Sequence, residues 1–230
     1  MIEPSEPDCV LCPPLRFRLN AMADLPGAAA VLAAEGGLFL MPDLAPLAEG
    51  HLLLVSDEHL VCAAEFDDAL WARARRWRDR VALLYETAYG SPGLALFEHG
   101  PGSPQGGGAC IDHAHWHLLP SVTGMRAVLE GLGLPGEEGS HDALRARFRA
   151  GRSYLLVEED GIATVHPGDG VPSQFLRRAA ALALDGRAPA AWRWQESFGL
   201  PDSRARFGRT LAAMRRAAEG QEPERADSHQ

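Results

Sequence analysis

Three histidines stand at alternate positions in the segment ACIDHAHWHLLPS, residues 109–121: they are His113, His115 and His117. In an extended strand, residues two apart project from the same face, at a spacing of about 7 Å. Histidine is scarce in this chain, at nine of 230 residues, so the pattern indicates a functional strand rather than three incidental side chains. The three imidazoles can hold one metal ion, or one of them can attack an electrophile while the others assist.

A second group with chemical potential is the N-terminal Cys9-x-x-Cys12 motif. Two thiolates at this spacing can supply half of a tetrahedral zinc site, and histidines are the obvious remaining donors. Redox chemistry is the alternative, but the surrounding sequence lacks the βαβ pattern typical of redox pairs. Two exposed thiols without a metal are the third interpretation. If zinc takes one histidine of the strand, the other two stay free for chemistry.

Composition limits the classes of partner. The formal net charge is −9, and the arginines are scattered through helical stretches rather than gathered in one block. Nucleic-acid affinity depends on clustered basic residues, so we expect no nucleic-acid partner, whereas a small anionic ligand is compatible. The acidic N-terminus lacks the apolar core of a secretory signal, and no apolar run reaches the roughly 18 residues of a membrane span. We therefore expect a cytoplasmic protein with reduced cysteines and no membrane association.

The elements that must position these residues can be predicted from periodicity. Residues Leu38–Met41 and His51–Val55 are two apolar runs joined by a short connection, which favours an antiparallel pair of strands. Apolar residues at steps of three and four predict an amphipathic helix over Glu65–Ala88. A strand over Gly93–Gly100 and the histidine strand follow. We expect an α+β domain over residues 1–124, with an antiparallel sheet of about five strands and one long helix packed on it.

A C-terminal α/β extension is expected over residues 125–218. The pair Asp160-Gly161 lies between two strand-like runs and predicts a hairpin turn. One helix is expected in the segment VPSQFLRRAAALAL, with Pro172 near its first turn, and another helix is predicted by the spacing of Phe207, Leu211 and Met214. The polar residues 219–230 are expected to form a disordered tail.

The histidine segment also resembles a known family. Its sequence has the pattern His-φ-His-φ-His-φ-φ, with φ an apolar residue, of the histidine-triad (HIT) superfamily of nucleotide hydrolases and transferases. The resemblance extends to a strand–turn–strand segment that leads to Gly50-His51, to His59 eight residues later, and to a Gly-rich loop before the triad. It covers roughly residues 9 to 121. It implies a nucleotide or nucleotide conjugate as the small-molecule partner.

The resemblance implies a role for each residue that matches the family's motif. His115 would be the nucleophile that attacks an α-phosphorus and forms a nucleotidyl-histidine intermediate, and His117 and His51 would lie beside the phosphate and the leaving group. Zinc-containing members imply a structural Zn²⁺ site made of Cys9, Cys12, His59 and His113. Imidazole suits the first role because its ordinary pKa of about 6.5 leaves it largely unprotonated at neutral pH. A closed four-ligand zinc has no open position, so it would orient the strand rather than catalyse.

The third histidine of the triad bears on the reaction class. Related uridylyltransferases have glutamine where this sequence has His117, so the resemblance favours hydrolysis of a nucleotide conjugate, with release of a nucleoside monophosphate. Nucleotidyl transfer or phosphorolysis to an acceptor other than water is the alternative, and a non-catalytic nucleotide-binding protein is a further one. A catalytic zinc held by all three triad histidines is disfavoured, because it leaves the cysteine pair and His59 unused.

Two short segments depart from the family's pattern. Many members carry Asn-x-Gly where this chain has Glu98-His99-Gly100, and Gln-Ser-Val where it has Ala-Cys110-Ile. The asparagine usually contacts ribose or phosphate, and the serine usually serves the leaving group. We therefore expect Glu98 and Cys110 to contact the substrate and to select a specialised one. Glu98 would repel a phosphate unless it binds ribose hydroxyls or is neutralised by a nearby histidine.

Further ligand contacts are expected outside the triad. The Gly-rich loop up to Gly108 can present backbone N–H groups to phosphate oxygens, although a plain connecting loop explains it equally well. Ser173, Gln174 and Arg177 lie at the start of a predicted helix, whose N-terminus favours anions, but capping explains the same residues.

The extension has two further expected roles. Trp192 and Trp194 can stack on a base, although packing of the extension onto the catalytic domain is favoured. Many histidine-triad proteins are dimers that extend their sheets across the interface, so a homodimer is compatible with the sequence. The extension can instead cover that sheet edge.

Overall fold

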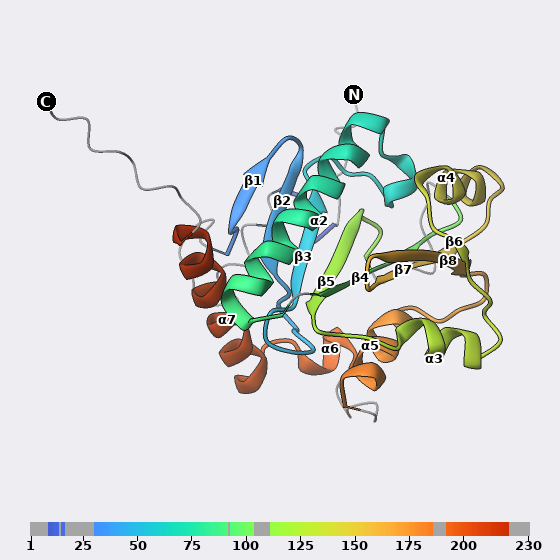
Figure 1. Ribbon diagram of the computed structural model, residues 1–230. Helices are drawn as coiled ribbons and strands as arrows, with labels where there is room; N and C mark the ends of the chain where they lie inside the picture. The colour runs from blue at the N-terminus through green and yellow to red at the C-terminus, as the bar shows by residue number, and fades with distance from the viewer. Residues whose placement is uncertain are drawn as a thin grey trace, which may run out of the picture.

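The computed structural model describes residues 9–13, 15–16, 30–91, 93–103, 111–185 and 192–220. Within these residues the strands form a single antiparallel sheet with the order β1-β2-β3-β5-β4-β7-β8-β6 (Figure 1). In chain order they are β1 (Ala33–Glu35), β2 (Leu38–Pro42), β3 (Leu52–Ser56), β4 (Leu94–Gly100), β5 (His115–Pro120), β6 (Glu137–Glu138), β7 (Tyr154–Glu159) and β8 (Ile162–Pro167). The predicted α+β class with an antiparallel sheet is confirmed. Strands β1 to β5 precede residue 124 and lie side by side in the sheet, and β6 to β8 follow it.

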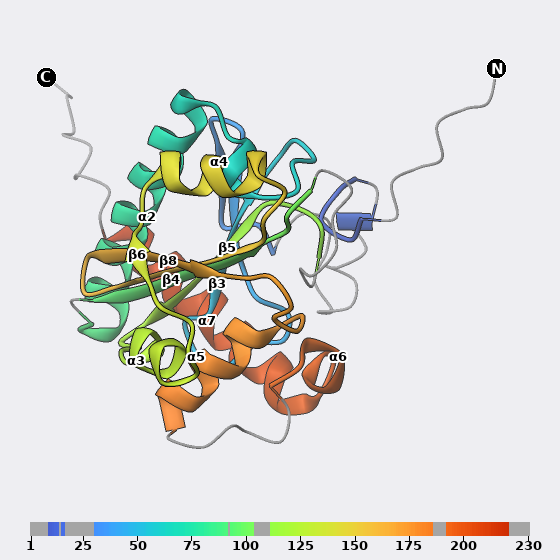
Figure 2. The same ribbon diagram turned by 90° about the vertical axis from the view of Figure 1, so that its right-hand side faces the viewer.

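Helices cover both faces of this sheet (Figure 2). They are η1 (Ala63–Glu65, a 3-10 turn), α2 (Asp68–Tyr89), α3 (Met125–Gly131), α4 (His141–Arg149), α5 (Phe175–Asp185), α6 (Trp194–Ser197) and α7 (Pro201–Glu219). One face packs against η1, α2, α4 and the end of α7, and the opposite face of β4, β5 and β7 packs against α3 and α5. None of the helices in the described part of the chain has the length and the apolar run that a membrane crossing requires.

The long helix forms where its periodicity predicts it. The carboxylate of Asp67 accepts the N–H of Leu70 at 2.6 Å and caps the first turn of α2. Gly90 ends the helix because its φ of 63° is a left-handed conformation that glycine adopts without strain. Between these caps the buried side chains recur at steps of three and four along one stripe: Leu70, Ala74, Trp77, Val81, Leu84 and Tyr85. This stripe packs on the sheet and fixes the strands that carry the histidines.

The histidine segment is a shorter strand than its sequence predicts. Strand β5 begins at His115, so the expectation of one continuous strand through residue 113 is wrong. The carbonyl of Ile111 accepts the N–H of His113 at 2.8 Å, and this tight turn takes His113 out of the strand. Within β5 the alternation holds: His115 and His117 are half-buried on one face, and the side chains on the other face are buried.

The extension continues the sheet rather than forming a separate layer. Strand β7 pairs with β4 over five residue pairs, from Leu96–Glu158 to Gly100–Tyr154. The edge of β4 is therefore covered by this chain itself. The β7–β8 hairpin turns at the predicted pair, where Asp160 and Gly161 have φ values of 53° and 75°. The boundary at residue 124 stays a prediction, and the tail from residue 221 lies outside the described residues.

Both helices predicted in the extension are present. The spacing of Phe207, Leu211 and Met214 falls within α7, and all three side chains are buried. The helix expected to have Pro172 near its first turn begins three residues after this proline, at Phe175. The delay has a local cause, because Gln174 adopts a φ of 63°, which lies outside the right-handed helical region.

Candidate active site and metal site

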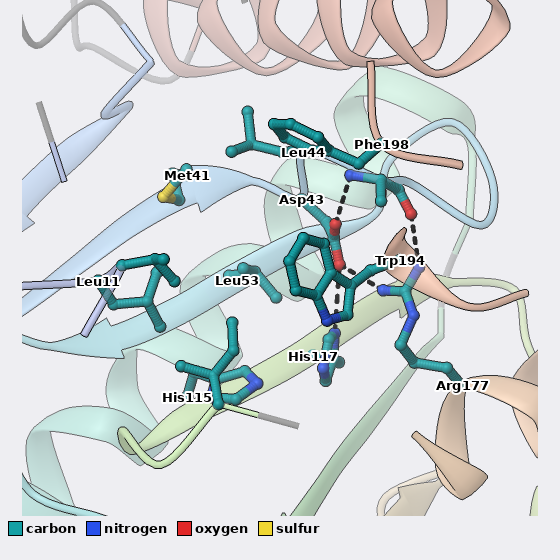
Figure 3. Close-up of a pocket in the computed structure, with 13 residues that line it drawn as sticks. Leu11, Met41, Asp43, Leu44, Leu53, His115, His117, Arg177, Trp194 and Phe198 are labelled. Atoms are coloured by element: carbon teal, nitrogen blue, oxygen red, sulfur yellow. Dashed lines mark hydrogen bonds and ion pairs between the residues drawn. The ribbon is translucent and has the colours of Figure 1, made fainter. Parts of the chain in front are cut away.

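A cavity of about 170 Å³ opens beside the histidine face of β5 (Figure 3). Three separate parts of the chain line it: the N-terminal segment, the β2–β3 region with β5, and the extension. The lining residues are Val10, Leu11, Met41, Asp43, Leu44, Ala45, Leu53, Ile111, His115, His117, Arg177, Trp194 and Phe198. Most of these are apolar, and the polar groups are an acid, an arginine and two histidines. Such a lining suits a ligand that is apolar at one end and anionic at the other.

His51 is buried and does not line the cavity, but it is in direct contact with His117, which does. Nε2 of His51 lies 2.9 Å from Nδ1 of His117. The backbone N–H of Leu47 donates to Nδ1 of His51 at 3.1 Å, so in the neutral ring the proton of His51 is on Nε2. That N–H then donates to Nδ1 of His117, which leaves the proton of a neutral His117 on its Nε2. The arrangement gives His117 a defined N–H donor.

The ring of His117 is held on a second side by Phe97. The two rings stack with centroids 4.7 Å apart and an interplanar angle of 14°. Phe97 pairs with His117 across β4 and β5, so the sheet register itself brings the rings together. Burial lowers the pKa of His117, although the nearby carboxylate of Asp43 acts in the opposite direction. His117 is therefore neutral at pH 7 while the cavity holds no further negative charge.

Asp43 is the main site residue that sequence reasoning missed. It is buried directly after β2, and its Oδ2 lies 3.5 Å from both Nε2 of His51 and Nδ1 of His117. Burial alone would raise the pKa of Asp43, but the Arg177 guanidinium and the two histidines hold it well below its usual range. Its signal in the sequence was an acid that directly follows a fully apolar strand.

Arg177 is the partner that keeps this buried acid charged. Its Nη1 donates to Oδ2 of Asp43 at 2.6 Å, and its Nη2 donates to the carbonyl of Ala45, also at 2.6 Å. Its Nε donates to the carbonyl of Trp192 at 3.2 Å. The side chain lines the cavity, and its donors join the turn after β2 to the extension, while its contact with a ligand stays a prediction. Asp43, His51 and His117 are close enough to hold a metal ion, yet the guanidinium already supplies the positive charge there.

Replacing Arg177 by methionine is expected to lower the free energy of unfolding by about 3–5 kcal/mol, because Asp43 would remain buried without its cation. Urea unfolding at pH 7 measures this loss. The double variant Arg177→Met/Asp43→Asn is expected to recover much of it. Arg193→Met is the matched control, since its pair with Glu196 is half exposed and contributes less than about 1 kcal/mol. Equal losses in both arginine variants would contradict the buried pair.

His115 lies on the same face of β5 with one nitrogen already engaged. Its Nδ1 lies 2.6 Å from the carbonyl oxygen of His113, which can only accept, so Nδ1 carries the proton. The lone pair of the neutral ring is therefore on Nε2. Burial, reinforced by the neighbouring His117, lowers the pKa of His115 to about 4. At neutral pH His115 is thus a neutral imidazole whose Nε2 is available to attack.

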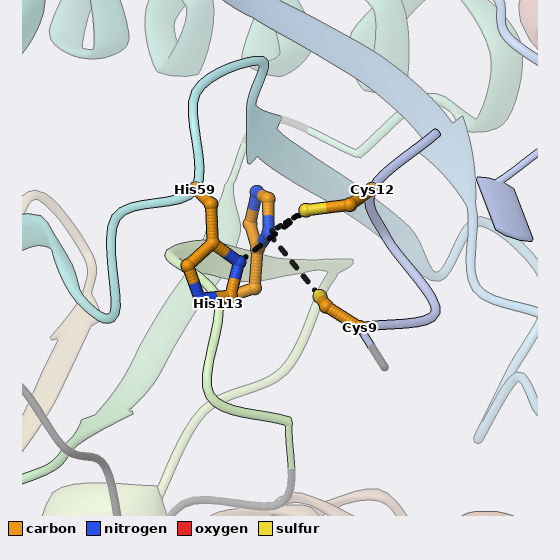
Figure 4. Close-up of side chains that lie close together, drawn as sticks. All are labelled: Cys9, Cys12, His59 and His113. Carbon is orange, nitrogen blue, oxygen red and sulfur yellow. Dashed lines mark hydrogen bonds between the residues drawn. The ribbon is translucent and has the colours of Figure 1, made fainter. Parts of the chain in front are cut away.

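Four side chains from distant parts of the sequence converge at a second cluster (Figure 4). Their ligand atoms all lie within 4.8 Å of one another, and the members are those that the resemblance implies: Cys9, Cys12, His59 and His113. Nδ1 of His113 is 3.4 Å from both sulfur atoms, and Nδ1 of His59 is 3.3 Å from Sγ of Cys12. Two sulfurs and two nitrogens at these separations suit a tetrahedral ion such as Zn²⁺.

The surroundings of His113 also fit a metal ligand. Its Nε2 lies 2.7 Å from the carbonyl oxygen of Ser56, so Nε2 carries the proton and Nδ1 presents its lone pair to the sulfurs. Burial and the neighbouring Cys9 raise the pKa of the Cys12 thiol to about 11. A divalent cation would supply the positive charge that favours the thiolate. The cluster is linked to His115, because the carbonyl of the cluster residue His113 accepts the N–H of His115.

Glu98 is not part of this site. Strand alternation puts Phe97 on the histidine face, so Glu98 projects from the opposite face toward η1. Its carboxylate is buried and accepts the hydroxyl of Tyr154 at 2.7 Å and the N–H of Ala63 at 2.9 Å. Burial raises the pKa of Glu98 to about 7. Contrary to the expected contact with substrate, Glu98 does not line the cavity. The next residue, His99, contacts the Ser153 hydroxyl at 3.1 Å.

The remaining predicted contacts lie elsewhere. Ser173 is exposed, and it precedes α5 rather than opening it. Gln174 is buried, and its side-chain oxygen accepts the backbone N–H of Trp194 at 2.8 Å. Gln174 therefore holds two segments of the extension together. Neither residue lines the cavity. The predicted contacts of Gly108 and Cys110 lie outside the described residues.

Comparison with models of protein families finds no match, and no curated protein matches the sequence. Among solved structures, the chain is similar to a member of the HIT family from Bacillus subtilis, with 21% identity and a TM-score of 0.36 over 49% of this chain and 72% of the other. A HIT-like protein involved in cell-cycle regulation from Bartonella henselae gives 13% identity and a TM-score of 0.39, over 63% of this chain and 99% of the other.

A third similar structure is the yeast Ap4A phosphorylase Apa2 in complex with AMP. It has 16% identity and a TM-score of 0.37, over 64% of this chain and 63% of the other. The first two of these structures are named as HIT-family or HIT-like proteins.

Proposed function

We propose that this chain is a HIT-type hydrolase that cleaves a nucleotide conjugate at its α-phosphate and releases a nucleoside monophosphate. The observation that carries the proposal is the hydrogen bond from Nδ1 of His115 to the carbonyl of His113. This bond leaves Nε2 of a neutral imidazole as the nucleophile, at a cavity that His117 also lines. The apolar part of the lining suits a nucleoside, and the histidine end suits its phosphate.

In the first step, Nε2 of His115 attacks the α-phosphorus. The new N–P bond replaces the bond from phosphorus to the leaving oxygen. A bound phosphate adds negative charge beside His117, which favours its protonated form despite the burial that lowers its pKa in the free protein. His117 then donates its Nε2 proton to the leaving oxygen. In this protonated ring Nδ1 also carries a proton, so the His51 N–H no longer donates to it, and the carboxylate of Asp43, whose Oδ2 lies 3.5 Å away, becomes its acceptor.

In the second step, water attacks the phosphorus of the nucleotidyl-histidine. Its oxygen forms the new P–O bond, the N–P bond breaks, and the water proton passes to His117, which the first step left neutral. The products are a nucleoside monophosphate and free His115. A zinc ion in the cysteine–histidine cluster would supply structural support, by fixing the segment whose carbonyl orients His115.

A panel of nucleotide conjugates tests the proposal. After incubation in ¹⁸O-labelled water, hydrolysis places one labelled oxygen in the nucleoside monophosphate, and a rapid quench leaves a nucleotidyl mass on His115. Added inorganic phosphate separates the alternative, because phosphorolysis yields an unlabelled nucleoside diphosphate instead. Equal turnover by wild type and His115→Ala would overturn the covalent mechanism. Binding without turnover of any conjugate would support the non-catalytic alternative.

A further inference from the structure

The extension supplies one wall of the cavity. Trp194 and Phe198 of the C-terminal segment line it together with Leu11 and Met41 from the first part of the chain. Figure 3 shows Leu11 and Met41 on one side and Trp194 with Arg177 on the other. A ligand that occupies the cavity therefore touches residues about 180 positions apart. The extension is part of the site and not only a cover for the sheet.

The position of Trp194 is fixed by two buried side chains of the segment that precedes it. The side-chain amide oxygen of Gln174 accepts the backbone N–H of Trp194 at 2.8 Å, and the side-chain amide nitrogen of Gln174 donates to the side-chain oxygen of Gln195 at 2.7 Å. Nε of Arg177 donates to the carbonyl of Trp192 at 3.2 Å. Because Arg177 also holds Asp43, the aromatic wall and the histidine end of the cavity share one anchor.

The indole of Trp194 carries an unpaired donor. Its Nε1 is buried, and none of the described residues accepts a hydrogen bond from it. The ring packs edge-on against Phe198, with centroids 6.0 Å apart at 83°, which restrains its orientation. A buried donor without an acceptor is unfavourable, so buried N–H groups in proteins are almost always paired. An unpaired N–H on a residue that lines the cavity is explained if a bound ligand brings the acceptor.

We propose that Trp194 determines the substrate specificity of this site: its ring packs against the nucleoside, and its Nε1–H donates to an acceptor atom of the bound nucleotide. This inference rests on the proposed function for the identity of the ligand. It adds a recognition element that lies outside the part of the chain that resembles the histidine-triad family. Substrates are then selected by the extension, while the histidines perform the reaction.

Nucleoside monophosphates, as the products of the proposed reaction, are suitable probes because they bind without turnover. Titration calorimetry with AMP, GMP, CMP and UMP identifies the one that wild type binds most tightly. Trp194→Phe keeps an aromatic ring but loses the N–H, and is expected to weaken binding of that nucleotide about 3- to 10-fold. Trp194→Ala also loses the ring and is expected to weaken it about 10- to 100-fold. Trp192→Phe is the matched control, since its side chain stacks on Arg193 and does not line the cavity.

The outcomes separate this inference from the proposed function. Weaker binding by Trp194→Phe, with wild-type affinity in Trp192→Phe and unchanged melting temperatures in both, supports the role of Trp194. Wild-type affinity in both Trp194 variants overturns it and leaves the histidine chemistry untouched. If wild type binds none of the four nucleotides and cleaves no conjugate, the proposed function fails and the role of Trp194 fails with it.

Discussion

Replacement of His115 by asparagine is expected to reduce kcat for a nucleotide conjugate by about 10⁴-fold or more, because the attacking nitrogen is lost. Asparagine can still fill part of the space and donate to the carbonyl of His113, so the fold is expected to persist. Steady-state kinetics measure the loss, and intact-protein mass spectrometry is expected to show no nucleotidyl adduct. His141→Asn is the control, since this histidine stacks on Trp71 at the opposite face of the sheet.

Metal content makes the His115 variant more decisive. His115 lies outside the cysteine–histidine cluster, so His115→Asn is expected to keep the same zinc content as wild type. Loss of zinc in this variant would mean that the triad histidines share one metal ion. That outcome would contradict the role of His115 as the attacking group. Retained zinc together with lost turnover would show that His115 acts in the reaction and that the metal is held by other residues.

The second large effect is expected at the cluster itself. Purified protein should contain one zinc ion per chain, and Cys12→Ser should lose it, because a hydroxyl is a poor substitute for a thiolate ligand. Structural zinc sites contribute folding free energy directly, so we expect the free energy of unfolding to fall by about 5 kcal/mol or more. Elemental analysis and urea unfolding measure the two quantities. Cys62→Ala is the control for metal content, because this buried thiol lies outside the cluster.

Loss of the metal is also expected to reduce turnover indirectly. The carbonyl of His113 accepts from His115, so a free His113 segment no longer fixes which nitrogen of the nucleophile is unprotonated. Treatment with a chelator should therefore lower kcat, and added Zn²⁺ should restore it. Full stability and activity in metal-free protein would contradict a structural ion at these four residues.

Local sequence patterns predicted the parts of the site that local geometry determines. The alternation of a strand was enough to put His115 and His117 on one face, and the helix stripe was enough to predict α2. The tight turn at Ile111 escaped prediction because nothing in the residue types distinguishes it from extended backbone. As a result, the start of β5 was predicted too early.

Contacts between distant segments could not be predicted in the same way. Asp43 and Arg177 are 134 positions apart, and their pairing depends on how the extension packs against the turn after β2. Trp194 reaches the cavity for the same reason. The error at Glu98 has a different cause: one residue of register decides which face of β4 a side chain occupies, and the family motif does not fix that register here.

The pairing of β7 with β4 has a consequence for how the chain can be divided or assembled. A fragment that stopped at residue 124 would expose the backbone of β4, whose sequence LALFEHG is largely apolar and would recruit other strands. In the described residues of the full chain, the outermost strands are instead β1 and β6, with three and two residues. Glu137 and Glu138, which make up β6, are both exposed. Short edge strands that carry charged residues resist the addition of a further strand. By covering β4 and ending the sheet in such a strand, the extension disfavours aggregation.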